Sequence, residues 1–143
     1  MIEKLIVDAE LLTPELNACL LTQELNDIVC VHSTRIKNKG SYIKRMNRLN
    51  QKPGEVDDLI GYCFLVENQS DCYKTLRLLK TNKDININKV LDYIKQPCGK
   101  NNYQAIHIKF EYKNTLGEIQ IKTKEMDAIN KTKYSNYKKT LIA

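Results

Sequence analysis

The sequence lacks several features that would place it in a specialised class of protein. Its 143 residues contain no apolar run near the roughly 18 residues that a bilayer-spanning helix needs, so we expect no membrane partner. The N-terminus, Met1 to Leu5, has no basic start, apolar middle or small-residue cleavage site, which predicts a cytoplasmic protein. Internal repeats and low-complexity linkers are also absent. We therefore expect a single domain over residues 1–143.

Cysteine is present, but not in a pattern that would bind metal or staple the fold. The five cysteines are odd in number and include no CxxC pair. Paired cysteines at that spacing are typical of zinc sites, and an even set in a short secreted chain is typical of a disulfide framework. Reduced thiols in a cytoplasm fit this sequence better than either.

Negative charge is scarce in two parts of the chain. Residues 31–54 contain seven Lys or Arg and no Asp or Glu, and residues 100–143 contain nine bases against four acids. Residues 1–30 have the opposite balance, with six acids and one base. Such clustering suits a polyanionic partner, either nucleotide phosphates or an RNA backbone. Composition does not separate these two from a solvated basic surface.

Apolar periodicity predicts helices and strands that alternate along the chain. Thr13, Pro14 and Glu15 have the form of an N-cap and first helical turn. Helices are expected over 14–26, over 41–49 with Ile43, Met46 and Leu49 inside, from 70, and after 123 with Met126, Ile129, Tyr134, Tyr137 and Leu141. Strands are expected from 28 and over 59–66, 89–94, 103–112 and 117–123. A mobile loop is expected over 97–102.

The segment from Gly117 to Thr123 is the first candidate for chemistry. Strand alternation places Glu118, Gln120 and Lys122 on one face and the two isoleucines between them in a core. Only Glu118 in this ladder can accept a proton, and the ladder is suited to a phosphorylated substrate. A solvated strand face is the alternative interpretation.

A second candidate consists of basic and hydroxyl side chains upstream. Arg35 and Lys37 share a strand face, and Ser41 and Arg45 are one helical turn apart, so all four can converge on one triphosphate. Asp58 enters the buried strand over 59–66 and is a candidate ligand for Mg²⁺, which accepts one or two protein carboxylates. A turn or helix-cap acid is the alternative for Asp58.

Five sequence blocks are informative when they are taken together. They are Arg35-x-Lys37-x-x-x-Ser41-x-x-x-Arg45-Met46, Asp58-Leu59-Ile60-Gly61, Asp92-Tyr93-Ile94-x-x-Pro97, Tyr103-Gln104-Ala105-Ile106-His107, and Glu118-Ile119-Gln120-Ile121-Lys122-Thr123 with Met126. In this order and near these spacings they resemble the synthetase domain of RelA/SpoT-type alarmone synthetases. The resemblance covers about residues 28–137.

The resemblance implies both a fold and a reaction. The fold would be α/β (α+β), a mixed β-sheet flanked by helices of the nucleotidyltransferase type. The reaction would move the β,γ-pyrophosphate of ATP to the 3′-hydroxyl of GDP or GTP and so make (p)ppGpp. By this resemblance ATP is held by Arg35, Lys37, Ser41 and Arg45, Mg²⁺ by Asp58 and Glu118, and the acceptor nucleotide by Tyr103, Asn101, Lys100, His107 and Gln120. Tyr103 would stack on guanine, and Glu118 would bind metal or activate the 3′-hydroxyl.

The chain also departs from the family's pattern. Cys63 and Lys122 stand where arginine is usual, Leu91 and Cys98 where lysine is usual, and Asn102 where glycine is usual, with one extra residue between Pro97 and Tyr103. Two further hypotheses therefore stay open. One is a toxin-like relative that acts on an adenine nucleotide or the 3′ end of tRNA, and the other is a degenerate module that binds a nucleotide or RNA.

Histidine is too scarce for the family's other domain. The bifunctional members of the family carry a hydrolase domain with a His-Asp metal motif, but His32 and His107 are the only histidines here and neither precedes Asp. We predict a synthetase without a hydrolase domain. The sequence leaves open the acceptor, an allosteric effector and the oligomeric state, including a homo-oligomer.

Overall fold

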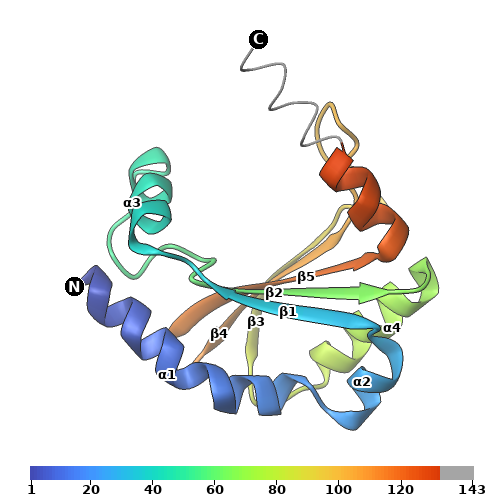
Figure 1. Cartoon of the computed structure of the whole chain (residues 1–143), viewed down its shortest axis with the longest axis horizontal. Coiled ribbons are helices and arrows are strands. Elements are labelled where there is room, and N and C mark those ends of the chain that lie inside the picture. The colour runs from blue at the N-terminus through green and yellow to red at the C-terminus, as the bar shows by residue number, and fades with distance from the viewer. Residues whose placement is uncertain (133–143) are drawn as a thin grey trace.

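A computed structural model describes residues 1–132 and contains a five-stranded mixed sheet with helices packed against it (Figure 1). In chain order the elements are α1 (Ile2–Leu20), α2 (Gln23–Ile28), β1 (Val31–Ile36), α3 (Lys39–Arg48), β2 (Ile60–Val66), α4 (Gln69–Lys80), β3 (Asn86–Asp92), β4 (Ile106–Tyr112) and β5 (Thr115–Thr123). Residues 124–132 are also helical. The predicted α+β class, with a mixed sheet flanked by helices, is confirmed.

The strands lie in the order β1-β2-β5-β4-β3, with β2 and β5 parallel and the other neighbours antiparallel. Residues in register on neighbouring strands project from the same face of a sheet. Two rows of residues therefore cross four strands side by side. We call them the glutamate row (Arg35, Gly61, Glu118 and Lys109) and the glutamine row (Ser33, Cys63, Gln120 and His107).

The other face of the sheet carries the hydrophobic core. Along β2 and β4 every second residue is buried and those between are half-buried, which is the pattern of a sheet with one covered face. Buried residues of α1 and α4 belong to the same core, and Figure 1 shows both helices on this side of the sheet. Gly117 reflects the tight packing, because a Cβ there would lie 2.5 Å from the ring of Phe110.

The predicted helix over residues 14–26 is wrong. Helix α1 begins at Ile2 and continues through Pro14, and a separate α2 has Thr22 as its N-cap. Thr13 is not an N-cap, because its hydroxyl donates to the carbonyl of Ala9 one turn earlier (2.8 Å). The apolar stripe of α1 packs against the core on both sides of the proline, and this packing outweighs the missing N–H of Pro14.

Several boundaries also differ from the prediction. The strand expected from residue 28 begins at Val31, because residues 23–28 form α2, and the strand expected from residue 103 begins at Ile106. In α3 the buried residue is Tyr42, whose hydroxyl accepts the N–H of Gly54 (2.8 Å), whereas Leu49 is 45% exposed. Other expected elements match closely, including β2, β5 and the buried Cys72, Leu76 and Leu79 of α4.

The C-terminal helix is described only in part. The predicted helix after Thr123 is confirmed over residues 124–132, where Met126 is buried and Ile129 is 43% exposed. The expected positions of Tyr134, Tyr137 and Leu141 lie outside the described residues. Within residues 1–132, no helix combines the length and the apolarity that crossing a membrane requires.

Candidate active site

A cleft of about 400 Å³ lies on the sheet face that carries the two rows. Its floor is formed by β1, β2 and β5, with Asp58 from the segment before β2 and Asp127 and Lys131 from helix 124–132 also lining it. A second cavity of about 430 Å³ lies between α1 and the β4–β5 turn, but its lining is mostly apolar, with Asp8 and Lys113 as its charged members. The cleft, whose lining carries more charged side chains, is therefore the better candidate for an active site.

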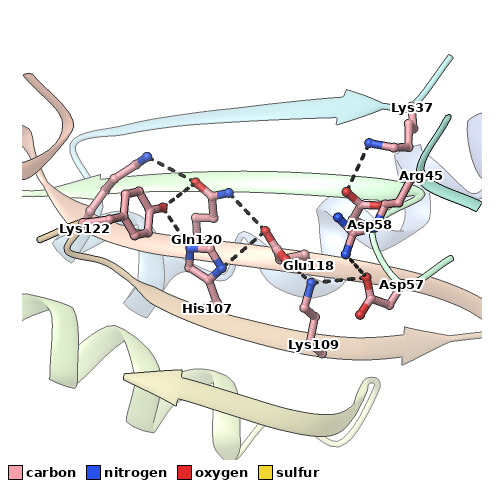
Figure 2. A network of polar contacts seen from close by, with 10 residues as sticks. Lys37, Arg45, Asp57, Asp58, His107, Lys109, Glu118, Gln120 and Lys122 are labelled. Atoms are coloured by element: carbon pink, nitrogen blue, oxygen red, sulfur yellow. Dashed lines mark hydrogen bonds and ion pairs between the residues drawn. The ribbon is translucent and has the colours of Figure 1, made fainter. Parts of the chain in front are cut away.

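A continuous network of polar contacts starts at the Asp58 end of the cleft (Figure 2). Lys37 Nζ lies 3.2 Å from Asp58 Oδ2, and Arg45 Nε lies 3.3 Å from Asp58 Oδ1. Arg45 also donates to Asp57 Oδ1 at 3.0 Å, and Lys109 Nζ lies 3.3 Å from that same oxygen. The network thus connects α3, the segment after β1, the segment before β2 and strand β4.

Glu118 continues the network on β5. Its carboxylate accepts hydrogen bonds from Lys109 Nζ and from Gln120 Nε2, the latter at 3.0 Å. Burial acts to raise the pKa of Glu118, but the hydrogen bonds from Lys109 and Gln120 outweigh burial and hold that pKa below its ordinary value. Glu118 is therefore ionised at neutral pH and available as a proton acceptor.

His107 stands next to Glu118 as a neutral group. Its Nδ1 lies 3.7 Å from Glu118 Oε1. Burial lowers the pKa of His107, and the charges of Lys109 and Lys122 lower it further, although Glu118 opposes them. The imidazole is therefore neutral at neutral pH, so its contact with Glu118 is not an ion pair there.

Tyr103 ends the network beside Gln120, one of the residues that line the cleft. Its hydroxyl lies 2.8 Å from His107 Nε2 and 3.4 Å from Gln120 Oε1. Its ring meets the rings of His107 and Tyr93 edge-on, and Lys122 Nζ lies 5.9 Å from the ring centroid. Burial raises the pKa of Tyr103, so the phenol is neutral and keeps its proton for hydrogen bonding.

The structure brings most of the predicted site residues together. Asp58, Lys37 and Arg45 form one group, Glu118, Gln120, His107 and Tyr103 form another, and Arg35 lines the cleft opposite Gly61. Three predicted residues lie at the periphery. Ser41 is exposed in the first turn of α3, where its N–H donates to Asn38 Oδ1 (2.8 Å), and Lys100 and Asn101 are exposed in the turn between Cys98 and Tyr103. The predicted 97–102 loop contains this turn, which is closed by two backbone hydrogen bonds of 3.0 Å between Cys98 and Tyr103.

Three residues in or beside the network are not among the predicted site residues. Asp57 and Lys109 join its two groups, and Tyr93 packs against Tyr103. A signal for Lys109 was present, since it lies two residues after His107 and so on the same strand face. Asp57 directly precedes the block that begins at Asp58, and Tyr93 is itself a member of the block that begins at Asp92.

The carboxylates at the Asp58 end suit a hard cation. Asp58 Oδ1 is buried and accepts no hydrogen bond from any part of the chain that the structure describes. Mg²⁺ takes one or two protein carboxylates and completes its shell with water and phosphate oxygens. No cage of three or more His, Cys, Asp or Glu side chains is found within residues 1–132. The donor set fits an ion held jointly by Asp58 and by the oxygens of a phosphorylated ligand.

Comparison with known proteins decides the family. Residues 34–141 match the model of a region found in RelA/SpoT proteins. The chain belongs to the RelA/SpoT family. It is also 31% identical, over 114 residues, to a probable guanosine-3′,5′-bis(diphosphate) 3′-pyrophosphohydrolase of Mycoplasma pneumoniae. That match covers 80% of this chain but only 15% of the longer relative, so it concerns one region of that protein.

Solved structures confirm the RelA/SpoT fold. The small alarmone synthetase 2 from Bacillus subtilis superposes with a TM-score of 0.80 and 26% identity, over 99% of this chain and 82% of that one. The small alarmone synthetase 1 from Bacillus subtilis, bound to its product pppGpp, superposes with a TM-score of 0.74 and 23% identity, over 93% and 76% of the two chains. The family predicted from the five sequence blocks is thus confirmed.

Proposed function

We propose that this RelA/SpoT-family chain is a pyrophosphokinase that transfers the β,γ-pyrophosphate of ATP to the 3′-hydroxyl of GDP or GTP. The observation that carries the proposal is the cleft itself, in which one polar network connects Asp58, Arg45 and the ionised Glu118. The similarity to a small alarmone synthetase bound to its product pppGpp supports the same reaction.

The basic end of the cleft is the proposed ATP site. Arg35, Lys37 and Arg45 supply the positive charge there, and the hydroxyl of Ser41 is the fourth proposed contact of ATP. Lys37 pairs with Asp58, and Arg45 pairs with both Asp57 and Asp58, so a bound triphosphate would replace these carboxylates with phosphate oxygens. Guanidinium groups offer two parallel hydrogen bonds to phosphate, and phosphoryl-type transfer relies mainly on such positioning and charge neutralisation.

Asp58 is the proposed principal ligand of Mg²⁺, and Glu118 is a second candidate ligand. When bound, the ion supplies positive charge that neutralises the phosphate oxygens during transfer. Asp58 fits this role because its buried Oδ1 has an ion-pair partner, Arg45 Nε, but accepts no hydrogen bond within residues 1–132. Arg45 would then turn from the carboxylate toward the phosphates.

Glu118 is the proposed proton acceptor for the 3′-hydroxyl of the acceptor nucleotide. Its depressed pKa keeps it ionised, and its neighbours Lys109 and Gln120 hold the carboxylate in place. Tyr103 is the proposed platform for the acceptor base, with Lys100, Asn101, His107 and Gln120 around the acceptor. Base-to-aromatic stacking contributes about 1 to 3 kcal/mol per base.

One set of parallel reactions tests this function. Purified protein is incubated with Mg²⁺, ATP labelled on its γ-phosphate and, separately, GDP, GTP, unlabelled ATP or tRNA, and a sample with EDTA measures the need for the metal. Transfer of label to GDP or GTP supports the proposal. Transfer to adenine nucleotide or tRNA alone would instead identify a toxin-like relative. Folded protein that labels no acceptor would contradict the proposal and leave a nucleotide-binding module.

A further inference from the structure

Lys109 lies directly opposite Glu118 across the antiparallel β4–β5 pair. Side chains at opposite positions of such a pair are close neighbours on one face, so the sheet itself brings the ammonium to the carboxylate. On its other side Glu118 is in register with Gly61, which has no side chain. Lys109 and Glu118 are each only 14% exposed, so the pair is largely shielded from water.

A second carboxylate reaches the same ammonium group. Lys109 Nζ lies 3.3 Å from Asp57 Oδ1, and Asp57 belongs to the segment before β2, which is separate from the hairpin that carries Lys109 and Glu118. Figure 2 shows the ammonium between the two carboxylates. Carboxylate oxygens that converge from separate elements are the ligands that a hard divalent cation prefers. Here an ammonium group holds that position.

We propose that Lys109 is a built-in cation that keeps divalent metal away from Glu118. The ammonium neutralises Glu118 and Asp57 together, which leaves Asp58 as the carboxylate for Mg²⁺, because its partners Lys37 and Arg45 can turn to a bound triphosphate. The inference rests on the proposed function, because it chooses between the two roles proposed there for Glu118, which are metal ligand and proton acceptor. Asp58 is then the metal ligand, and Glu118 stays without metal and receives the proton.

The physical reason is repulsion between like charges in a partly buried site. A divalent ion bound by Glu118 and Asp57 would lie beside the Lys109 ammonium, and charges that are poorly screened by water repel strongly. Lys109 could leave only by breaking its contacts with both carboxylates. Lys109 thus acts through Glu118 as a positioning residue.

Binding of Mn²⁺, a paramagnetic substitute for Mg²⁺, tests the inference in the absence of nucleotide. Unbound Mn²⁺ is measured by electron paramagnetic resonance during titration of the full chain. We expect Lys109→Met to bind Mn²⁺ at least about tenfold more tightly than the wild type, because a repelling charge is gone. Adding Asp57→Asn to Lys109→Met should abolish the gain, and Lys109→Arg, which keeps a cation, should bind like the wild type.

Lys113→Met is the matched control. Lys113 lies in the turn of the same hairpin, and its Nζ pairs with Glu15 Oε1 at 2.7 Å, so the substitution also removes one positive charge and releases one carboxylate. It should leave Mn²⁺ affinity unchanged. Circular dichroism and melting temperature establish that each variant is folded, and Lys109→Gln replaces Lys109→Met if the latter does not fold.

A folded Lys109 variant that binds Mn²⁺ no more tightly than the wild type would overturn the inference. The same gain in Lys113→Met would also overturn it, because the effect would then be one of net charge. No nucleotide takes part in this titration. Its outcome is therefore separate from the outcome of the transfer assay, and either proposal can fail while the other stands.

Discussion

Cys63 is the position where the chain departs from its family inside the cleft. Cys63 lies on the same face as Gly61 and Leu65, and it stands between Ser33 and Gln120 in the glutamine row. Burial raises the pKa of the Cys63 thiol, so the group is neutral. A neutral thiol cannot supply the fixed positive charge of the arginine that is usual in the family.

Cys63→Arg should therefore raise turnover. The side chain faces the cleft, so a guanidinium there can extend toward bound phosphates, and a charge-assisted hydrogen bond contributes roughly 1.5 to 3 kcal/mol, or about tenfold or more in rate. Turnover and melting temperature are measured together. A folded variant with unchanged turnover would show that the departure is irrelevant to the chemistry. A large fall in melting temperature would show that the guanidinium is buried without a partner.

Tyr103 provides a test of acceptor binding. Tyr103→Ala should weaken acceptor affinity about tenfold, since stacking on a base contributes about 1 to 3 kcal/mol, while ATP affinity changes little. Tyr103→Phe keeps the ring but loses the contact of the hydroxyl with His107, so we expect only a small change in acceptor affinity. Nucleotide titration by calorimetry distinguishes the two ligands. Loss of folded structure in Tyr103→Ala would assign the residue to the core instead.

At the scale of elements, the sequence predicts best where one pattern is long and uninterrupted. Strand β2 was predicted within one residue because its eight-residue apolar run is bounded by acidic turn residues. Helix α1 was mispredicted because Pro14 gives a strong local signal, whereas the packing that overrides it involves residues distant in sequence. Tertiary packing therefore decided where local propensity failed.

The turn after β3 supplies a prediction about pH. Asp92 Oδ1 accepts the N–H groups of Ile94 and Lys95, each at 3.0 Å, and Oδ2 accepts the hydroxyl of Tyr73 at 2.7 Å. Burial acts to raise the pKa of Asp92, but these hydrogen bonds prevail and hold it below its ordinary 3.8. A carboxyl whose pKa is lower in the folded state stabilises the fold above its unfolded pKa. That contribution is lost as pH falls through the folded pKa.

Asp92→Asn should therefore cost about 1 to 2 kcal/mol of unfolding free energy at neutral pH, through weakened hydrogen bonds at the turn. The variant should also lose less stability than the wild type when pH falls below about 4, because it has no carboxyl to protonate. Urea denaturation at neutral pH and below about pH 4 measures the unfolding free energy of the variant and of the wild type. Asp84→Asn, an exposed aspartate before β3, is the control, and equal acid dependence in both variants would contradict the assignment.

At the scale of the whole molecule, the site depends on strand order and register. The motif residues and their alternation along each strand were readable from the sequence. The parallel pairing of β2 with β5, which places Gly61 beside Glu118, joins segments more than fifty residues apart and has no local signal. The β4–β5 hairpin, in contrast, does have a local signal. Two residues with positive φ, Lys113 and Asn114, form its tight turn and thereby fix Lys109 opposite Glu118.

Glu118 is the residue on which the proposed pyrophosphate transfer depends most. Glu118→Gln preserves the shape of the side chain and removes its charge, and Glu111→Gln makes the same change on β4 at a position outside the cleft lining. With labelled ATP, Mg²⁺ and the preferred acceptor, we predict that Glu118→Gln, while folded, transfers at least about a hundredfold more slowly than the wild type. Glu111→Gln should match the wild type. Equal turnover in Glu118→Gln and the wild type would show that the Glu118 carboxylate does not take part in the transfer.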